Sequence, residues 1–160
     1  MQRGSRAAFA RDAENLVSIY VVVMDGSAEG RAALRYAADG AARTGGTVEI
    51  VTVIEPTEFV EWGGVQAAME EEARLRAEAM VLGASGAIAE EAGIQPKVTV
   101  RQGDSVKEVT ELLRERRDVV ALVLGAASEG GPGPLVSHFA GPVAGTLPCP
   151  LIIVPGGMWE

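Results

Sequence analysis

The fold of this chain is decided by residues 19–27, which read IYVVVMDGS. The first six form a short apolar run rich in β-branched side chains, which is typical of a buried strand. Asp25, Gly26 and Ser27 then interrupt the run with turn and helix-capping residue types. The stretch therefore predicts a buried strand that leads directly into a helix with Ser27 as its N-cap.

The same alternation of strand and helix continues along the chain. Alanines recur at helical spacing after Ser27, and Gly45 and Gly46 end that helix near Arg43. Another helix with one apolar face begins at Ser105. Apolar runs predict strands at residues 48–54, 119–124 and 151–154, and alternation of polar and apolar residues predicts another at 97–101.

A long helix is expected at about residues 65–91, which are rich in Ala, Glu, Arg and Met. Gly83, Ser85 and Gly86 are poor helix formers in its interior, and they either bend or divide the helix or allow close packing. The preceding residues 55–64 contain a proline, two glycines and no sustained period, so we expect a surface loop there.

Strands that alternate with helices predict a doubly wound α/β fold, in which helices cover both faces of a parallel sheet. No repeat, low-complexity tract or shift in composition indicates a second folded unit, so we expect one domain over residues 17–160. Residues 1–16 carry arginines and acidic residues without a continuous apolar stretch. We interpret them as a flexible N-terminal arm rather than a targeting segment.

The charge balance and composition argue against several kinds of partner. Fourteen basic and twenty-two acidic residues give a net charge of −8, which repels nucleic acid and anionic membrane surfaces. The longest apolar runs are also too short to cross a bilayer. Cys149 is the only cysteine, which excludes an intrachain disulfide and a multi-thiolate metal site and is consistent with a reducing, cytoplasmic environment.

A ligand of such a sheet binds beyond the carboxyl ends of the strands, where the direction of winding reverses. Asp25 follows the first strand and Gly125 follows the fourth, so the two meet there if those strands are neighbours. The glycine-rich loop after Gly125 either holds an anion through its amides or serves turn geometry. Pro132 and Pro134 favour turn geometry, because proline has no amide proton.

Two motifs carry a resemblance to a known family. The sequences VVVMDGS at residues 21–27 and PCPLIIVP at residues 148–155 resemble the universal stress protein family, and the order of elements between them is the same. The resemblance covers residues 18–156. It implies a five-stranded parallel sheet in the strand order 3-2-1-4-5 and a general role in stress tolerance.

In family members that hold ATP, the fourth strand leads into Gly, two residues, Gly, nine residues, Gly and then Ser or Thr. One register on this sequence pairs Gly131 with Gly141. It leaves residues 144–147 as the only remaining helix before Pro148, and it puts Pro142 in the place of the hydroxyl residue. Such a short helix makes a poor crossover to the fifth strand.

A second register is anchored on Pro148 and is the one we adopt. It predicts a helix of about three turns over residues 137–147, long enough to cross back to the fifth strand. Ser137 and His138 then start this helix in place of the Gly-Ser pair, and Ser128 stands near the place of the second glycine. The loop is one residue shorter than the family pattern.

The resemblance implies a nucleotide cleft that takes ATP or AMP. The aspartate after the first strand and backbone of the second strand contact the adenosine part, and the glycine loop contacts ribose and phosphates. The corresponding candidates here are Asp25, Val53, Gly125, Ser128, Gly131, Ser137 and His138. Only Asp25 and Gly125 match the ATP-binding pattern cleanly, which predicts a degenerate cleft.

The sequence offers little for catalysis. His138 at a helix start either touches an anion, shuttles a proton or merely begins the helix. Neither paired carboxylates nor a metal-ligand cluster accompanies it, so we expect no enzyme and no metal site. Asp25 likewise either satisfies free helix amides or contacts a ligand. Cys149 between two prolines is expected to be a packed thiol.

The last strand predicts assembly. It runs from Leu151 to Val154, and an apolar strand at a sheet edge invites pairing with another chain. The resemblance implies a two-fold homodimer through this strand, with Met158 and Trp159 adding apolar contact. Two functions stay open: a dimeric, non-catalytic stress-response protein that binds an unknown protein partner and no nucleotide, and an ATP- or AMP-binding protein with ligand-dependent association.

Overall fold

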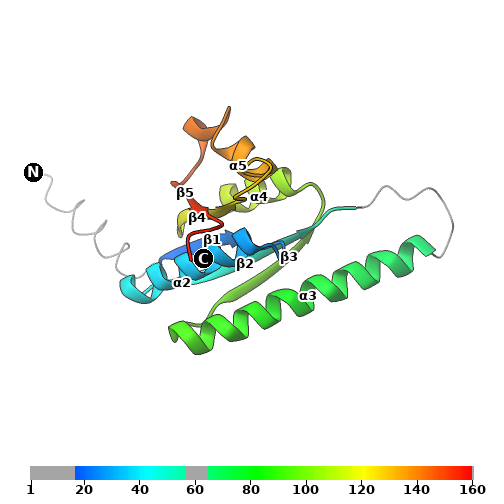
Figure 1. Ribbon diagram of the computed structural model, residues 1–160, viewed down its shortest axis with the longest axis horizontal. Coiled ribbons are helices and arrows are strands. Elements are labelled where there is room, and N and C mark those ends of the chain that lie inside the picture. The colour runs from blue at the N-terminus through cyan, green and yellow to red at the C-terminus, as the bar shows by residue number, and fades with distance from the viewer. Residues whose placement is uncertain (1–16, 57–64, 160) are drawn as a thin grey trace, which may run out of the picture.

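The computed structural model describes residues 17–56 and 65–159 of the 160-residue chain (Figure 1). Two predictions fall elsewhere: the flexible arm at 1–16 lies wholly outside the described residues, and so does most of the loop at 55–64. Within the described ranges, no helix is both long and apolar enough to cross a membrane.

Five strands form one parallel sheet in the order β3-β2-β1-β4-β5. The central strand β1 pairs with β2 on one side and with β4 on the other, so the direction of winding reverses between β1 and β4. This arrangement confirms the predicted fold and strand order. The strands are β1 (Ile19–Val23), β2 (Thr47–Ile54), β3 (Lys97–Gln102), β4 (Val119–Ala126) and β5 (Leu151–Pro155).

Helices cover both faces of the sheet (Figure 1). Val22 of β1 packs in one apolar cluster with the first two helices, whereas Val21 and Val23 pack in a second cluster with the last two. Burial on both faces explains why β1 is continuously apolar. The first pair is α2 (Ala28–Thr44) and α3 (Val65–Ala92), and the second pair is α4 (Ser105–Glu115) and α5 (Pro134–Phe139).

Local sequence fixes both ends of α2. The Oγ atom of Ser27 accepts a hydrogen bond from the Gly30 N–H at 3.0 Å, which confirms the predicted N-cap. Gly45 ends the helix in the left-handed conformation, with φ +70°. The face of α2 toward the sheet is mostly alanine, so the helix lies close to the strands; its buried apolar residues are Ala32, Ala33, Leu34, Ala37, Ala38 and Ala41.

The long helix α3 is continuous over 28 residues. Gly83 and Gly86 do not divide it, and a Cβ atom at either position would have no neighbouring atom within 4 Å. Close packing within the described part of the chain is therefore a wrong explanation for these glycines. Only Val81 and Ile88 of α3 are buried, so most of this helix faces solvent.

One carboxylate is buried in the sheet beside α4. Glu49 on β2 is 1% exposed and accepts hydrogen bonds at 2.7 Å from the Arg116 guanidinium and from the Thr99 hydroxyl. Arg116 also donates to Asp118, and this hydrogen bond lowers the pKa of Asp118 below its ordinary value. Because both oxygens of Glu49 are partnered, the buried charge fastens the end of α4 to β2.

The helix predicted at residues 137–147 is wrong. The structure has the six-residue helix α5, Pro134–Phe139, and then only a 3₁₀ turn, Ala144–Thr146. Proline is favoured in the first turn of a helix, which explains the start at Pro134. Pro142 stops any continuation, because its ring clashes with the preceding turn and it has no N–H to donate.

The early start of α5 moves two candidate residues. Ser137 and His138 lie inside the helix, with His138 in its last turn, so the expectation that they begin a helix is wrong. The register that pairs Gly131 with Gly141 left little helix before Pro148, and it describes this segment better than the register that we adopted.

Candidate functional site

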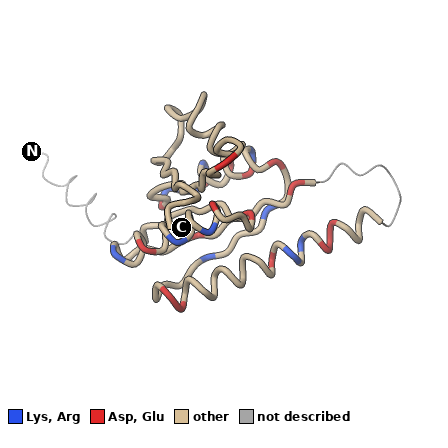
Figure 2. Tube along the Cα trace, in the orientation of Figure 1, with Lys and Arg blue, Asp and Glu red and all other residues tan. Residues whose placement is uncertain are grey.

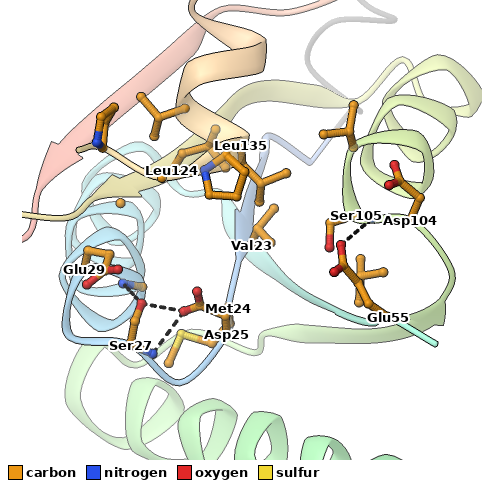
Figure 3. Close-up of a pocket in the computed structure, with 18 residues that line it drawn as sticks. Val23, Met24, Asp25, Ser27, Glu29, Glu55, Asp104, Ser105, Leu124 and Leu135 are labelled. Carbon is orange, nitrogen blue, oxygen red and sulfur yellow. Dashed lines mark hydrogen bonds between the residues drawn. The ribbon is translucent and has the colours of Figure 1, made fainter. Parts of the chain in front are cut away.

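A cleft of about 510 Å³ opens at the carboxyl ends of β1 and β4, where the winding reverses (Figure 3). Five segments line it: the β1–α2 turn, the end of β2, the start of α4, the end of β4 and the loop into α5. Val23, Val53 and Leu124 contribute apolar surface from three strands. The volume lies within the range of small-molecule sites, and the position is the one expected for ligands of doubly wound sheets.

The β1–α2 turn forms one wall and holds its own carboxylate in place. The Oδ1 atom of Asp25 accepts hydrogen bonds from the backbone N–H of Ser27, at 3.0 Å, and from the Ser27 hydroxyl (Figure 3). Gly26 has φ +83°, which a residue with a side chain rarely adopts. This wall is therefore a tight turn whose polar groups largely satisfy one another.

Gly125 lies at the junction between β4 and α2. A Cβ atom at this position would overlap the carbonyl oxygen of Glu29 in the first turn of α2. The missing side chain lets the strand and the helix meet at the bottom of the cleft. Packing alone thus requires glycine here, whether or not a ligand binds.

The opposite wall comes from residues that the sequence analysis did not single out. Glu55 follows β2 and accepts a hydrogen bond from the Ser105 N–H at 3.3 Å. Asp104 is the N-cap of α4 and accepts from the Lys107 N–H at 2.9 Å. An Asp-Ser pair before an amphipathic helix is a recognisable cap signal. No comparable signal places Glu55 across the cleft, because that contact joins segments 50 residues apart.

The loop from β4 to α5 forms the fourth side. Gly130, Gly131 and Gly133 have φ values of +73°, +90° and +99°, so these glycines serve the turn. The loop reaches the cleft through Pro132, Gly133 and Pro134. The two prolines cannot donate a backbone hydrogen bond, which leaves Gly133 as the only amide donor of the three.

The predicted site residues separate into two groups. Asp25, Val53 and Gly125 lie together in the lining of the cleft. The other four belong to the loop and to α5 but are not among the lining residues: Ser128, Gly131, Ser137 and His138. The side expected to contact adenosine is thus assembled, whereas most of the side expected to contact phosphate lies elsewhere.

The described lining is acidic. Asp25, Glu29, Glu55 and Asp104 contribute four carboxylates, and none of the lining residues is lysine or arginine. Figure 2 shows how acidic and basic residues are distributed along the described chain. Glu29 and Asp104 stand at the N-termini of α2 and α4, where they complement the helix dipoles. They thereby occupy the places at which these helices would attract an anion.

Two kinds of reactive group are missing from the described lining of the cleft, a metal-binding cluster and a thiol. No set of three or more His, Cys, Asp or Glu side chains in this part of the chain lies close enough to hold a metal ion. Cys149 is half-buried outside the lining, and burial raises the pKa of its thiol, which disfavours the reactive thiolate.

The sheet order defines a doubly wound α/β protein, and its cleft lies at the switch point where ligands of this fold class bind. A family model described as the Universal stress protein family matches residues 19–155. The chain belongs to the universal stress protein family, and the resemblance found in its two end motifs is confirmed. No curated protein shows significant similarity to it.

Solved structures of this family share the fold. The universal stress protein UspA from Lactobacillus plantarum superposes with a TM-score of 0.74 at 17% identity, over 86% of this chain and 97% of that one. A family member from Burkholderia pseudomallei gives 0.68 at 20% identity, over 88% and 98%. The protein from Archaeoglobus fulgidus in complex with dAMP gives 0.58 at 18% identity, over 86% and 97%.

Proposed function

We propose that this chain is a non-catalytic, cytoplasmic stress-response protein that works as a homodimer and does not hold a nucleotide by its phosphates. The observation that carries this proposal is the acidic lining of the cleft. The described residues that surround its volume of about 510 Å³ include four carboxylates and no basic side chain. Phosphate groups placed there would be repelled by like charges. The family membership supplies the stress-response role.

The loop chemistry supports the same conclusion. Phosphate binding by a glycine-rich loop depends on several backbone N–H groups that converge on one point. Here prolines occupy two of the lining positions, 132 and 134. The helix that follows has six residues and no side-chain cap, so it contributes little dipole to attract an anion.

The proposed dimer uses β5. This strand lies at the edge of the sheet, and Ile153 in its middle is 41% exposed. Its unpaired backbone groups and apolar side chains are suited to pairing with a second copy about a two-fold axis. Met158 and Trp159 lie near Ile152, around a hollow of about 350 Å³ beside β5, and enlarge the apolar surface available to the partner.

A second candidate function is AMP-type binding with ligand-dependent association. One observation favours it: Asp25 and Val53 remain together in an open cleft, and a structural relative from Archaeoglobus fulgidus was solved with dAMP. In this version the adenosine part would supply most of the affinity, and the single phosphate would point toward solvent.

The test compares adenine compounds that carry three, one or no phosphate groups. The purified protein is denatured and assayed for released adenine nucleotide, and its melting temperature is then measured with 1 mM ATP, AMP or adenosine. We expect no released nucleotide and no shift with ATP. A ligand at about 100 times its Kd stabilises by about 2.7 kcal/mol, which a melting curve detects readily.

The outcomes separate the two candidates. Copurified ATP or a clear shift with ATP would overturn the proposal, because the acidic lining would then be compatible with a triphosphate. A shift with AMP and not with ATP would support the second candidate. Sedimentation of the wild type and of the edge variant Ile153→Arg tests the dimer, and the variant is expected to be monomeric at concentrations where the wild type pairs through β5.

A further inference from the structure

Helix α3 carries an apolar stripe on the side that faces away from the sheet. Ala68, Leu75 and Leu82 recur every seven residues, which is just short of two helical turns, and Ala79 lies beside them. Leu75 is 56% exposed and Leu82 is 64% exposed, whereas the opposite side of the helix holds the buried Val81 and Ile88. A soluble helix normally exposes charge on that side.

Ion pairs border this stripe on both flanks. Arg76 pairs with Glu72 at 3.2 Å on one flank, and Arg74 pairs with Glu78 at 3.1 Å on the other. Figure 2 shows the two basic residues lying between acidic ones along α3. An apolar seven-residue repeat between charged flanks is the pattern of a helix that pairs with another helix.

The first half of α3 is available for such pairing. All of its buried residues lie in the second half, at Val81 and Ile88, and Figure 1 shows the beginning of the helix extending past the sheet.

Two glycines in the second half of α3 are also unexplained by the described chain. Gly83 and Gly86 have open space where a Cβ atom would be. Glycine inside a helix costs about 1 kcal/mol relative to alanine, and no contact within the described chain compensates for it.

We propose that α3 pairs with α3 of a second copy of this chain, antiparallel, about a two-fold axis near Leu75. The flanking charges argue for this occupant and this register. In such a pair each charged flank of α3 lies against the identical flank of the partner helix, and the two helices run in opposite directions. Glu72 then faces the partner's Arg76, and Arg74 faces the partner's Glu78, so each of the four ion-paired residues meets an opposite charge across the pair.

Side-chain volumes agree with the antiparallel direction. An axis near Leu75 sets the small side chain of Ala68 opposite the large side chain of the partner's Leu82. This pairing fills the seam, the contact between the two apolar stripes, evenly along its length. A parallel pair would set Leu82 against its own copy and Ala68 against its own copy. It would also bring the two sheets to the same end of the helix pair, since only the second half of α3 lies on the sheet. This interface is separate from β5 and extends the proposed dimer toward a tetramer.

Disulfide trapping tests the direction and the register together. Single cysteines are placed at Leu75→Cys or Leu82→Cys in a chain that also carries Cys149→Ser and Ile153→Arg, so that neither the native thiol nor β5 contributes. Near a two-fold axis, Leu75→Cys faces its own copy and is expected to form a covalent dimer under mild oxidation. Leu82→Cys lies about 21 Å from its own copy in this register and is expected to cross-link at least tenfold more slowly.

The remaining outcomes contradict the proposal. Lys107→Cys, exposed on α4, reports the rate of random collision. If Leu75→Cys cross-links no faster than Lys107→Cys, α3 does not pair. If Leu82→Cys cross-links as fast as Leu75→Cys, the pair is parallel and the register is wrong. All three positions are exposed in the structure, so circular dichroism is expected to show an unchanged fold.

Charge exchange supplies a second measurement by sedimentation, again with Ile153→Arg. Arg76→Glu sets two acidic residues against each other on both halves of the seam, and we expect the Kd to rise about fivefold. The double substitution Glu72→Arg with Arg76→Glu restores opposite charges and is expected to return the Kd close to its starting value. Equal Kd values for all three proteins would overturn the assigned register. Because every protein in this test carries Ile153→Arg, the results do not depend on whether the wild type forms the proposed β5 dimer.

Discussion

The two sides of the cleft are built in different ways. On the β1–α2 side, a capped helix of 17 residues follows the turn and buries seven residues against the sheet. On the β4–α5 side, a loop with three glycines at positive φ leads into a helix of six residues whose N-cap, Gly133, makes no side-chain hydrogen bond. On the first side the turn is held by packing and capping. On the second side the loop is held by the stereochemistry of glycine and proline, and α5 is held by the burial of Val136 and Phe139.

This difference explains why the cleft persists while its expected phosphate side does not. The turn at Asp25 is also the start of α2, so any change there would disturb a large part of the core. The loop carries few core contacts, and its sequence is free to lose amide donors without loss of the fold. The fold therefore maintains the cleft even though the loop offers few amide donors.

The largest expected effect is on the α5 side. Phe139 is fully buried and, with Val136, provides the buried contact of that short helix. Phe139→Ala should lower the free energy of unfolding by about 4 kcal/mol, through lost burial and the cavity left behind. Urea unfolding at equilibrium measures it. A loss below 1 kcal/mol would show that α5 contributes little to the domain, which would sharpen the contrast between the two sides.

The next prediction concerns the residue at which the two sides meet. Gly125→Val should cost about 3 kcal/mol, because the new side chain overlaps the Glu29 carbonyl and forces β4 and α2 apart. Gly145→Val is the matched control, since a Cβ atom there has no neighbour within 4 Å, and it should stay within about 0.5 kcal/mol of the wild type. Equal stability of the two variants would contradict the packing role assigned to Gly125.

Serines on the two sides should respond differently. Ser27→Ala removes the cap of α2 and should cost about 1 kcal/mol. Ser137→Ala on α5 changes an exposed side chain away from the helix start and should change stability by less than about 0.5 kcal/mol. Chemical unfolding of both variants checks the pair. A larger loss for Ser137→Ala would mean that the α5 side is anchored by its polar residues after all.

The smallest expected effect tests the electrostatics of the cleft. Glu55→Lys replaces a lining carboxylate by an ammonium and should strengthen AMP binding about fivefold, as expected for one charge pair near the surface. Glu129→Lys makes the same change of charge on the loop outside the lining and should have a weaker effect. Titration by NMR measures both. Identical affinities would show that position in the cleft does not matter.

Most of the architecture could be predicted from the sequence because it depends on local patterns. The turn after β1, the cap at Ser27 and the apolar or alternating patterns of the five strands each lie within a few consecutive residues. The helix over residues 137–147 was predicted wrongly because the need for a long crossover was given more weight than Pro134 and Pro142. Those two prolines act locally and set the actual limits of α5.

The sequence by itself determined the doubly wound class, the family and the position of the cleft, since strand and helix periodicity and two short motifs suffice for these. Only the tertiary structure decided what lines the cleft. Glu55 and Asp104 come from segments far from Asp25, and Gly125 proved to be required by its contact with Glu29. Such contacts depend on how the elements pack, and the charge of a site is the sum over all the segments that packing brings together.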